Sequence, residues 1–142
     1  MKRYFEISLV IILFCIAAGA FADEKTGRPS CEICGMYIDQ FHDTSTHLTS
    51  KNGEIKKTCG VACMLRIVND KGGPAAFTKI EVHDWKNKTL IPAADAVYVI
   101  GSKRIPDMTP NIIAFEKKED AEAFRAKEGG MIYGNRIKSS QK

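Results

Sequence analysis

The chain of 142 residues is long enough for one domain or two very small ones. Its hydrophobic fraction of 44% supports a globular core and excludes a largely disordered chain. The net charge of +4 comes from mixed acidic and basic residues without a basic stripe, so the composition argues against a nucleic-acid-binding protein.

The N-terminal segment has the features of a secretory signal. Lys2 and Arg3 precede an apolar run over residues 7–18, and the small residues in Ala20-Phe21-Ala22 predict cleavage after residue 22. The apolar run is short for a membrane-spanning helix, so an uncleaved anchor is the less favoured alternative. We therefore expect residues 1–22 to be a signal peptide and the protein to be exported to the periplasm, with the membrane export machinery as a partner.

One cysteine lies inside the signal, at Cys15. A lipoprotein signal needs a small residue directly before the lipidated cysteine, whereas Phe14 is large. We expect Cys15 to be discarded with the signal, and a lipid anchor is the alternative. Removing the signal lowers the net charge from +4 to +3, because two basic residues and one acidic residue are lost.

The first chemical motif of the mature chain is Cys31-Glu32-Ile33-Cys34-Gly35-Met36, after a polar leader at 23–30. It places three soft sulfur atoms within six residues, and its glycine favours a tight turn. A Cys-x-x-Cys pair alone is ambiguous, but thiolates together with a thioether suit Cu(I) better than a hard cation. The motif therefore predicts a soft-metal site.

The first half of the chain predicts two strands, a helix and a third strand. Residues 36–41 are apolar enough for an extended segment before these elements. Asn52-Gly53 favours the tight turn of a hairpin, because this pair adopts positive φ angles. Thr58 is the expected N-cap of the helix, and glycines and a proline at 70–74 end it. The four elements are expected at residues 44–50, 55–58, 59–69 and 76–84.

The second half predicts the same order of elements. A turn at 85–89 and a short strand at 90–92 precede it. The nearly continuous apolar run at 96–101 predicts a central strand. A loop at 102–110 follows. The remaining strand, helix and strand are expected at residues 111–116, 118–128 and 131–133.

These patterns predict an α+β fold of two small ββαβ units packed as one compact domain, because each half is too small to bury much core alone. We place the units at residues 31–86 and 87–138, with a loose tail at 139–142. Asp84-Trp85 is expected to lock the junction between the halves.

A second cysteine pair, Cys59 and Cys63, falls at i and i+4 of the expected helix and so on one helical face. That face is roughly opposite an apolar stripe, so we expect both thiols to face solvent or the Cys-x-x-Cys loop. The stripe consists of Val61, Met64, Leu65 and Val68.

Three outcomes stay open for this pair. The two thiols form disulfides with Cys31 and Cys34, since exported proteins meet an oxidising compartment. They join those cysteines in a four-thiolate site for Zn(II) or Cu(I). They stay free or form their own redox pair.

Two further groups of residues bear on the site. Met108 lies in a proline-bracketed polar loop, a poor place for a core methionine, and is a candidate thioether ligand. His42, His47 and His83 are scattered along the sequence, and we expect surface or satisfied side chains rather than ligands. His47 or His83 could still cap a sulfur site.

The chain resembles the NosL family of exported copper-binding accessory proteins of nitrous oxide reductase, the copper enzyme of denitrification. The resemblance lies in residues 31–38, in Asp84-Trp85, in the run from Ala96 to Ser102, in Met108, in Ile113-Ala114-Phe115 and in residues 120–130. It implies ββαβ units similar to a part of the organomercurial lyase fold, Cu(I) binding, and delivery of copper to the copper–sulfide centre of the reductase. Many members of this family are lipoproteins, whereas the lipidation signal is absent here.

The leading hypothesis is a periplasmic Cu(I) chaperone that is not an enzyme and that serves a client copper enzyme. A structural zinc- or disulfide-stapled interaction module is the alternative, and a thiol–disulfide oxidoreductase is the third. The candidate metal ligands are Cys31, Cys34, Met36, Met108, Cys59 and Cys63.

Overall fold

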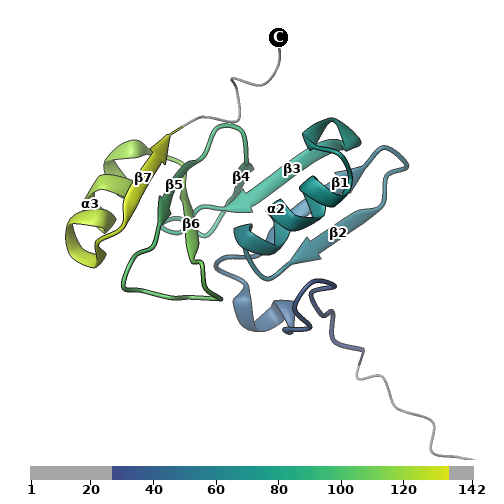
Figure 1. The fold of residues 1–142 in the computed structure, drawn as a ribbon, viewed down its shortest axis with the longest axis horizontal. Helices are drawn as coiled ribbons and strands as arrows, with labels where there is room; N and C mark the ends of the chain where they lie inside the picture. The colour runs from purple at the N-terminus through teal and green to yellow at the C-terminus, as the bar shows by residue number, and fades with distance from the viewer. Residues whose placement is uncertain (1–26, 135–142) are drawn as a thin grey trace, which may run out of the picture.

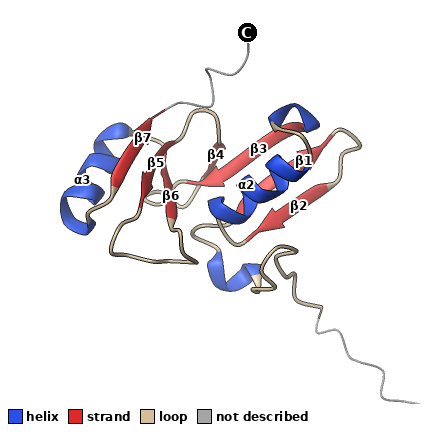
Figure 2. Cartoon of the chain, viewed as in Figure 1, coloured by secondary structure: helices blue, strands red, loops and turns tan. Residues whose placement is uncertain are grey.

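In the computed structural model, which describes residues 27–134, two antiparallel sheets lie beside each other and each is packed against one helix (Figure 1; Figure 2). The expected signal peptide and the tail at 139–142 lie outside the described residues. Neither helix of the described part has the length and apolar character needed to cross a membrane.

The first sheet has the strand order β2-β1-β3-β4 and is covered on one face by α2. Its turn between β1 and β2 confirms the hairpin prediction, because Gly53 has φ of +86° and the side chain of Asn52 accepts a hydrogen bond from the amide of Glu54. The elements are β1 (Thr46–Ser50), β2 (Ile55–Thr58), α2 (Val61–Asp70), the short 3-10 helix η2 (Pro74–Ala76), β3 (Phe77–His83) and β4 (Leu90–Pro92).

The second sheet has the order β6-β5-β7, so the strand predicted to be central is central. Its helix ends at Gly129, whose φ of +74° permits the chain reversal into the last strand. The elements are β5 (Val97–Ile100), β6 (Ile112–Phe115), α3 (Lys118–Glu128) and β7 (Met131–Gly134).

The predicted pair of ββαβ units is confirmed, as β1-β2-α2-β3 and β5-β6-α3-β7. The short strand β4 lies after the expected boundary at residue 87 but pairs with β3 in the first sheet. The residue-level division between the two units stays a prediction.

Two local predictions were wrong. Residues 38–41 form a 3-10 helix, η1 (Ile38–Phe41), rather than an extended segment, because the amides that follow bond back to the carbonyls of Tyr37 and Phe41 instead of to a strand. The helix α2 begins at Val61 with Gly60 as its N-cap. The hydroxyl of Thr58 does not cap it, because it bonds the carbonyl of Gly60 and the hydroxyl of Thr46.

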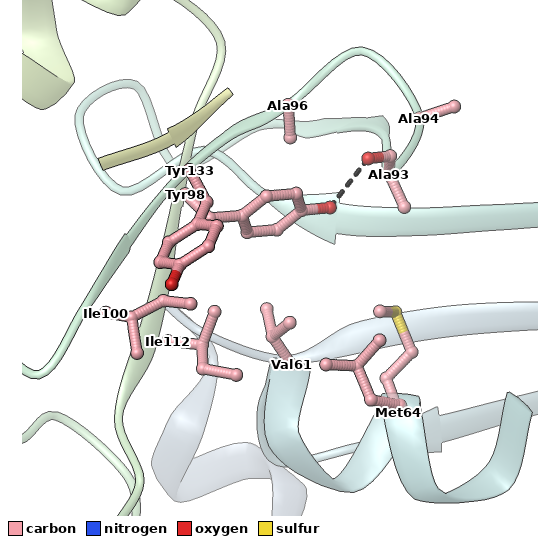
Figure 3. Close-up of a pocket in the computed structure, with 10 residues that line it drawn as sticks. Val61, Met64, Ala93, Ala94, Ala96, Tyr98, Ile100, Ile112 and Tyr133 are labelled. Carbon is pink, nitrogen blue, oxygen red and sulfur yellow. Dashed lines mark hydrogen bonds between the residues drawn. The ribbon is translucent and has the colours of Figure 1, made fainter. Parts of the chain in front are cut away.

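One hydrophobic core joins the two units. Val61 and Met64 of α2 project towards Tyr98, Ile100 and Ile112 of the second sheet and line an apolar pocket of about 160 Å³ (Figure 3). In this pocket the hydroxyl of Tyr98 donates a 2.6 Å hydrogen bond to the carbonyl of Ala93. The α2 stripe differs at one position from the prediction, since Leu65 is 42% exposed and Ile67 is buried in its place.

A buried carboxylate fixes the junction between the units. Asp84 is fully buried and accepts hydrogen bonds from the amides of Asn87, at 2.8 Å, and Glu116, at 3.0 Å. The amide of Trp85 donates to the carbonyl of Ala114, and the Trp85 ring packs against Phe124 of α3. Asp84-Trp85 therefore links the end of β3 to β6 and α3, as predicted.

Replacing Asp84 by alanine should lower the free energy of unfolding by about 1–3 kcal/mol, because two backbone donors lose their acceptor in a largely buried place. Chemical denaturation followed by circular dichroism measures this change. Asp70→Ala, at the exposed end of α2, is the matched control and should stay within about 0.5 kcal/mol of the parent. Equal stability of the two variants would contradict the role of Asp84.

Candidate metal centre

Four cysteine sulfurs converge at the N-terminal end of α2. The Sγ atoms of Cys31, Cys34, Cys59 and Cys63 all lie within 4.8 Å of one another. The Cys34 and Cys59 sulfurs are 3.4 Å apart, and those of Cys59 and Cys63 are 3.7 Å apart. All four thiols are free rather than paired in disulfides.

These separations suit a single metal ion at the centre of the sulfurs. A tetrahedral site with metal–sulfur bonds of about 2.3 Å places its sulfurs about 3.8 Å apart. The separations of 3.4 Å and 3.7 Å lie within a few tenths of an ångström of this value. The cluster therefore needs only small movements to surround one ion.

The Cys-x-x-Cys loop owes its shape to a tight turn. The amide of Cys31 donates to the carbonyl of Met36, and the amide of Gly35 donates to the carbonyl of Cys31, both at 2.8 Å. Gly35 has φ of +75°, a conformation that residues with a Cβ atom rarely adopt. The turn folds Cys31 and Cys34 towards the same side, where their sulfurs meet the second pair.

The second cysteine pair brackets the start of α2. Cys59 follows β2 and Cys63 lies in the first turn of the helix, so the expected sharing of one helical face is wrong. The carbonyl of Cys59 accepts a 2.8 Å hydrogen bond from the hydroxyl of Thr44, which fixes the backbone there. Both thiols are fully buried and face the Cys-x-x-Cys loop.

The loop between β5 and β6 adds a thioether to the cluster. The Sδ atom of Met108 lies 3.2 Å from the sulfur of Cys63, although 45 residues separate them in the sequence. Met36 also packs against the cysteines and is half-buried. Ile33, Ile38 and Phe41 complete an apolar surrounding for the sulfurs.

A partly buried carboxylate in the same loop was not found from the sequence. Oδ1 of Asp107 is buried without a hydrogen-bond partner. Burial raises the pKa of Asp107, against the lowering effect of the amides of residues 107 and 108. The carboxylate lies against Gly60, where a Cβ atom would clash with it. A negative charge on Asp107 would partly offset the charge of a bound cation. The only sequence signal for Asp107 was its position next to Met108.

The cysteines differ in acidity. Burial raises the pKa of Cys31, but hydrogen bonds from the backbone of Cys59, Cys34 and Ile33 outweigh it and bring the pKa down to about 7. Burial and the neighbouring Cys31 charge raise the pKa of Cys63 to about 12 and also raise that of Cys59. The cluster thus holds one ready thiolate beside two thiols that a metal ion must deprotonate.

The histidines do not join the cluster. Within residues 27–134, no imidazole nitrogen belongs to the group of ligand atoms gathered around the four sulfurs. His83 is buried and hydrogen-bonded to Ser45, as expected for a satisfied side chain.

Comparisons with known proteins found a matching family and a similar solved structure. A family model described as NosL matches residues 18–138. The copper-binding lipoprotein NosL of Stutzerimonas stutzeri is 30% identical over 110 residues, which are 72% of this chain and 57% of that protein, so the chain spans little more than half of this relative. The crystal structure of the copper chaperone NosL from Shewanella denitrificans is similar with a TM-score of 0.68 and 28% identity, over 80% of this chain and 90% of that one.

The acidity of Cys31 can be tested in the reduced, metal-free protein. Thiolate absorbance in the ultraviolet should rise through a step with its midpoint near pH 7, because Cys31 is protonated below that pH and ionised above it. Cys31→Ser should remove this step. A step that survives in Cys31→Ser would show that another thiol carries the low pKa.

Proposed function

Because the chain belongs to the NosL family, whose model matches residues 18–138, we propose that it is an exported Cu(I)-binding metallochaperone. The relatives are named as a copper-binding lipoprotein and a copper chaperone, not as enzymes. Copper is then the cargo of the protein, bound at one site and released to a partner.

The observation that carries this proposal is the gathering of four thiols and a thioether at one place. Soft sulfur ligands select Cu(I), and a thioether is a poor ligand for the harder cations. Thioethers also cannot be lost to disulfide formation in an oxidising compartment. The proposed ligand set is Cys31, Cys34, Met36, Cys59, Cys63 and Met108.

The exposure of the sulfurs suggests how the cargo leaves. Cys31, Cys59 and Cys63 are buried, whereas Cys34, Met36 and Met108 are half-buried. An acceptor could therefore replace the half-buried ligands first and draw the ion out by ligand exchange. The proposed acceptor is a periplasmic copper enzyme, nitrous oxide reductase, with its copper–sulfide centre as the destination.

A structural Zn(II) site is the second candidate, favoured by the four-cysteine geometry itself. Metal analysis of protein purified under reducing conditions separates the two. Stoichiometric zinc that resists displacement by Cu(I) would favour the structural site, whereas ready uptake of about one Cu(I) supports the chaperone.

The thiol–disulfide oxidoreductase is less well supported. Such enzymes need an accessible, acidic thiol to attack the substrate disulfide. Here the acidic thiol, Cys31, is only 1% exposed, and the more accessible one is Cys34. Failure to catalyse insulin reduction, together with tight Cu(I) binding, would dismiss this function.

Replacing both Met36 and Met108 by leucine should weaken Cu(I) binding more than about tenfold, since the thioethers are lost while side-chain volume is kept. A competition titration with a Cu(I) chelator measures the affinity. Met131→Leu is the matched control, because Met131 is 61% exposed on β7 in the second sheet. Unchanged affinity in the double variant would remove the methionines from the site.

Gly60→Ala tests the contribution of the β5–β6 loop by steric means. Gly60 has an extended backbone that any residue can adopt, but its Cβ atom would lie 1.7 Å from the Asp107 carboxylate. The Asp107 side chain must shift, and we expect the loop that carries Met108 to move with it, so that Cu(I) affinity falls about tenfold. Gly134→Ala, which meets no atom within 4 Å, is the control. A folded Gly60→Ala protein with parental affinity would show that the loop does not hold the ion.

A further inference from the structure

The three histidines of the chain, scattered in sequence, converge on one surface of the first sheet. The ring centroid of His83 lies 5.0 Å from that of His42 and 6.1 Å from that of His47. They come from three different segments, namely the turn after η1, strand β1 and the end of strand β3.

Strand register explains why two of the rings meet. His47 of β1 lies directly opposite Glu81 of β3, and His83 is two residues further along the same strand. Residues two apart on a strand share a face, so His47, Glu81 and His83 lie on one side of the sheet. Leu48 and Val82 point to the other side, into the core beneath α2.

One nitrogen of the middle ring is fixed by a hydrogen bond. Nδ1 of His83 lies 2.8 Å from the carbonyl oxygen of Ser45, which can only accept a hydrogen bond, so Nδ1 carries the proton. The lone pair is then on Nε2. Metal-binding histidines are commonly fixed in this way, with one nitrogen donating to a carbonyl and the other free to coordinate.

The spacing of the His83 ring from each of its two neighbours suits a shared ion once the rings turn, because the ligand atoms already gathered among the described residues are those of the cysteines. With metal–nitrogen bonds of about 2.0–2.1 Å and tetrahedral angles, two coordinating imidazoles place their ring centroids about 5 Å apart, and wider angles place them about 6 Å apart. His42 must turn its ring to complete the set, and its 71% exposed side chain leaves it room to do so. The backbones of His47 and His83 are held on paired strands.

The surrounding charges permit a cation. Burial, with Lys57, His83 and Lys79, lowers the pKa of His47, so its ring is largely neutral near neutral pH. The carboxylates of Asp43 and Glu81 lie beside the rings, in ion pairs with Lys88 and Lys79. Such surface pairs contribute little stability, so either carboxylate can turn to an ion.

We propose that His42, His47 and His83 form a second metal site that takes a divalent first-row transition-metal ion, with Cu(II) bound most tightly. Imidazole suits these ions, and Cu(II) has the highest affinity in the divalent series. The site is separate from the sulfur cluster, although both lie at one end of the first sheet. Between them runs the segment in which Thr44 bonds the carbonyl of Cys59 and Ser45 bonds His83.

Electron paramagnetic resonance provides the test, because Cu(II) is visible and Cu(I) is silent. The purified protein is first loaded with Cu(I) under argon until no free thiol remains, and one equivalent of Cu(II) is then added. The expected signal is that of a tetragonal Cu(II) ion with hyperfine coupling to two or more nitrogens. A signal without nitrogen coupling, or one identical to Cu(II) in buffer, would overturn the proposal.

Two surface variants assign the ligands without disturbing the buried ring. His47→Gln and His42→Gln should each weaken Cu(II) binding, the first by about tenfold or more. Thr49→Gln, on the same face of β1, is the matched control and should bind as the parent does. Parental affinity in His47→Gln would refute the site.

A second measurement makes the result independent of the sulfur cluster. Long-range proton–nitrogen spectra of the imidazoles, recorded with one equivalent of Zn(II) added to the Cu(I)-loaded protein, should show the Nε2 resonance of His83 shifting on binding. Cu(I) affinity is measured in the same variants and should not change. Loss of Cu(I) binding in a histidine variant would overturn the separate site, as would absent imidazole shifts, whereas failure of the parent protein to bind Cu(I) would count against the proposed chaperone function alone.

Discussion

The convergence of five sulfur atoms at the start of α2 is the constraint on which the rest of the structure depends. Three separate segments must meet there, namely the turn at 31–36, the junction between β2 and α2, and the loop at 102–110. Burial and the neighbouring charge of Cys31 raise the pKa of Cys63, whereas backbone hydrogen bonds lower the pKa of Cys31, so the packed thiols differ in acidity. An apolar surrounding excludes water and strengthens the preference for a soft ion.

Both ββαβ units are needed to build this site. The cysteines belong to the first unit, whereas Met108 and the partly buried carboxylate of Asp107 come from a loop between two strands of the second. The hydrogen bonds of Asp84 and the shared hydrophobic core under α2 hold the two units together. Under the proposed function, Cu(I) binding is therefore expected to depend on the junction, although Asp84 and Trp85 are not among the proposed ligands.

Strand β1 and the turn before it lie between the sulfur cluster and the three histidines. Thr44 supports the backbone of the sulfur cluster, while the neighbouring Ser45 orients the ring of His83 on the other face of the sheet. Sulfur ligands in an apolar surrounding favour a monovalent soft ion, and imidazoles with nearby carboxylates favour a divalent one. Under the two proposals, one small domain offers distinct environments to the two oxidation states of copper.

The sequence by itself determined what depends on neighbouring residues. Asn52-Gly53 predicted the hairpin through its backbone preferences, and the alanines before Gly129 predicted the helix at about 118–128. The spacing of Cys31, Cys34 and Met36 predicted a soft-metal motif. Local signals failed at 36–41, where a short helix could not be told from an extended segment. Only the tertiary structure decided which thiols meet, that Asp107 is partly buried beside them and that the histidines converge. Each of these depends on strand register and loop placement between residues far apart in the chain, and such contacts leave no periodic pattern in a single sequence.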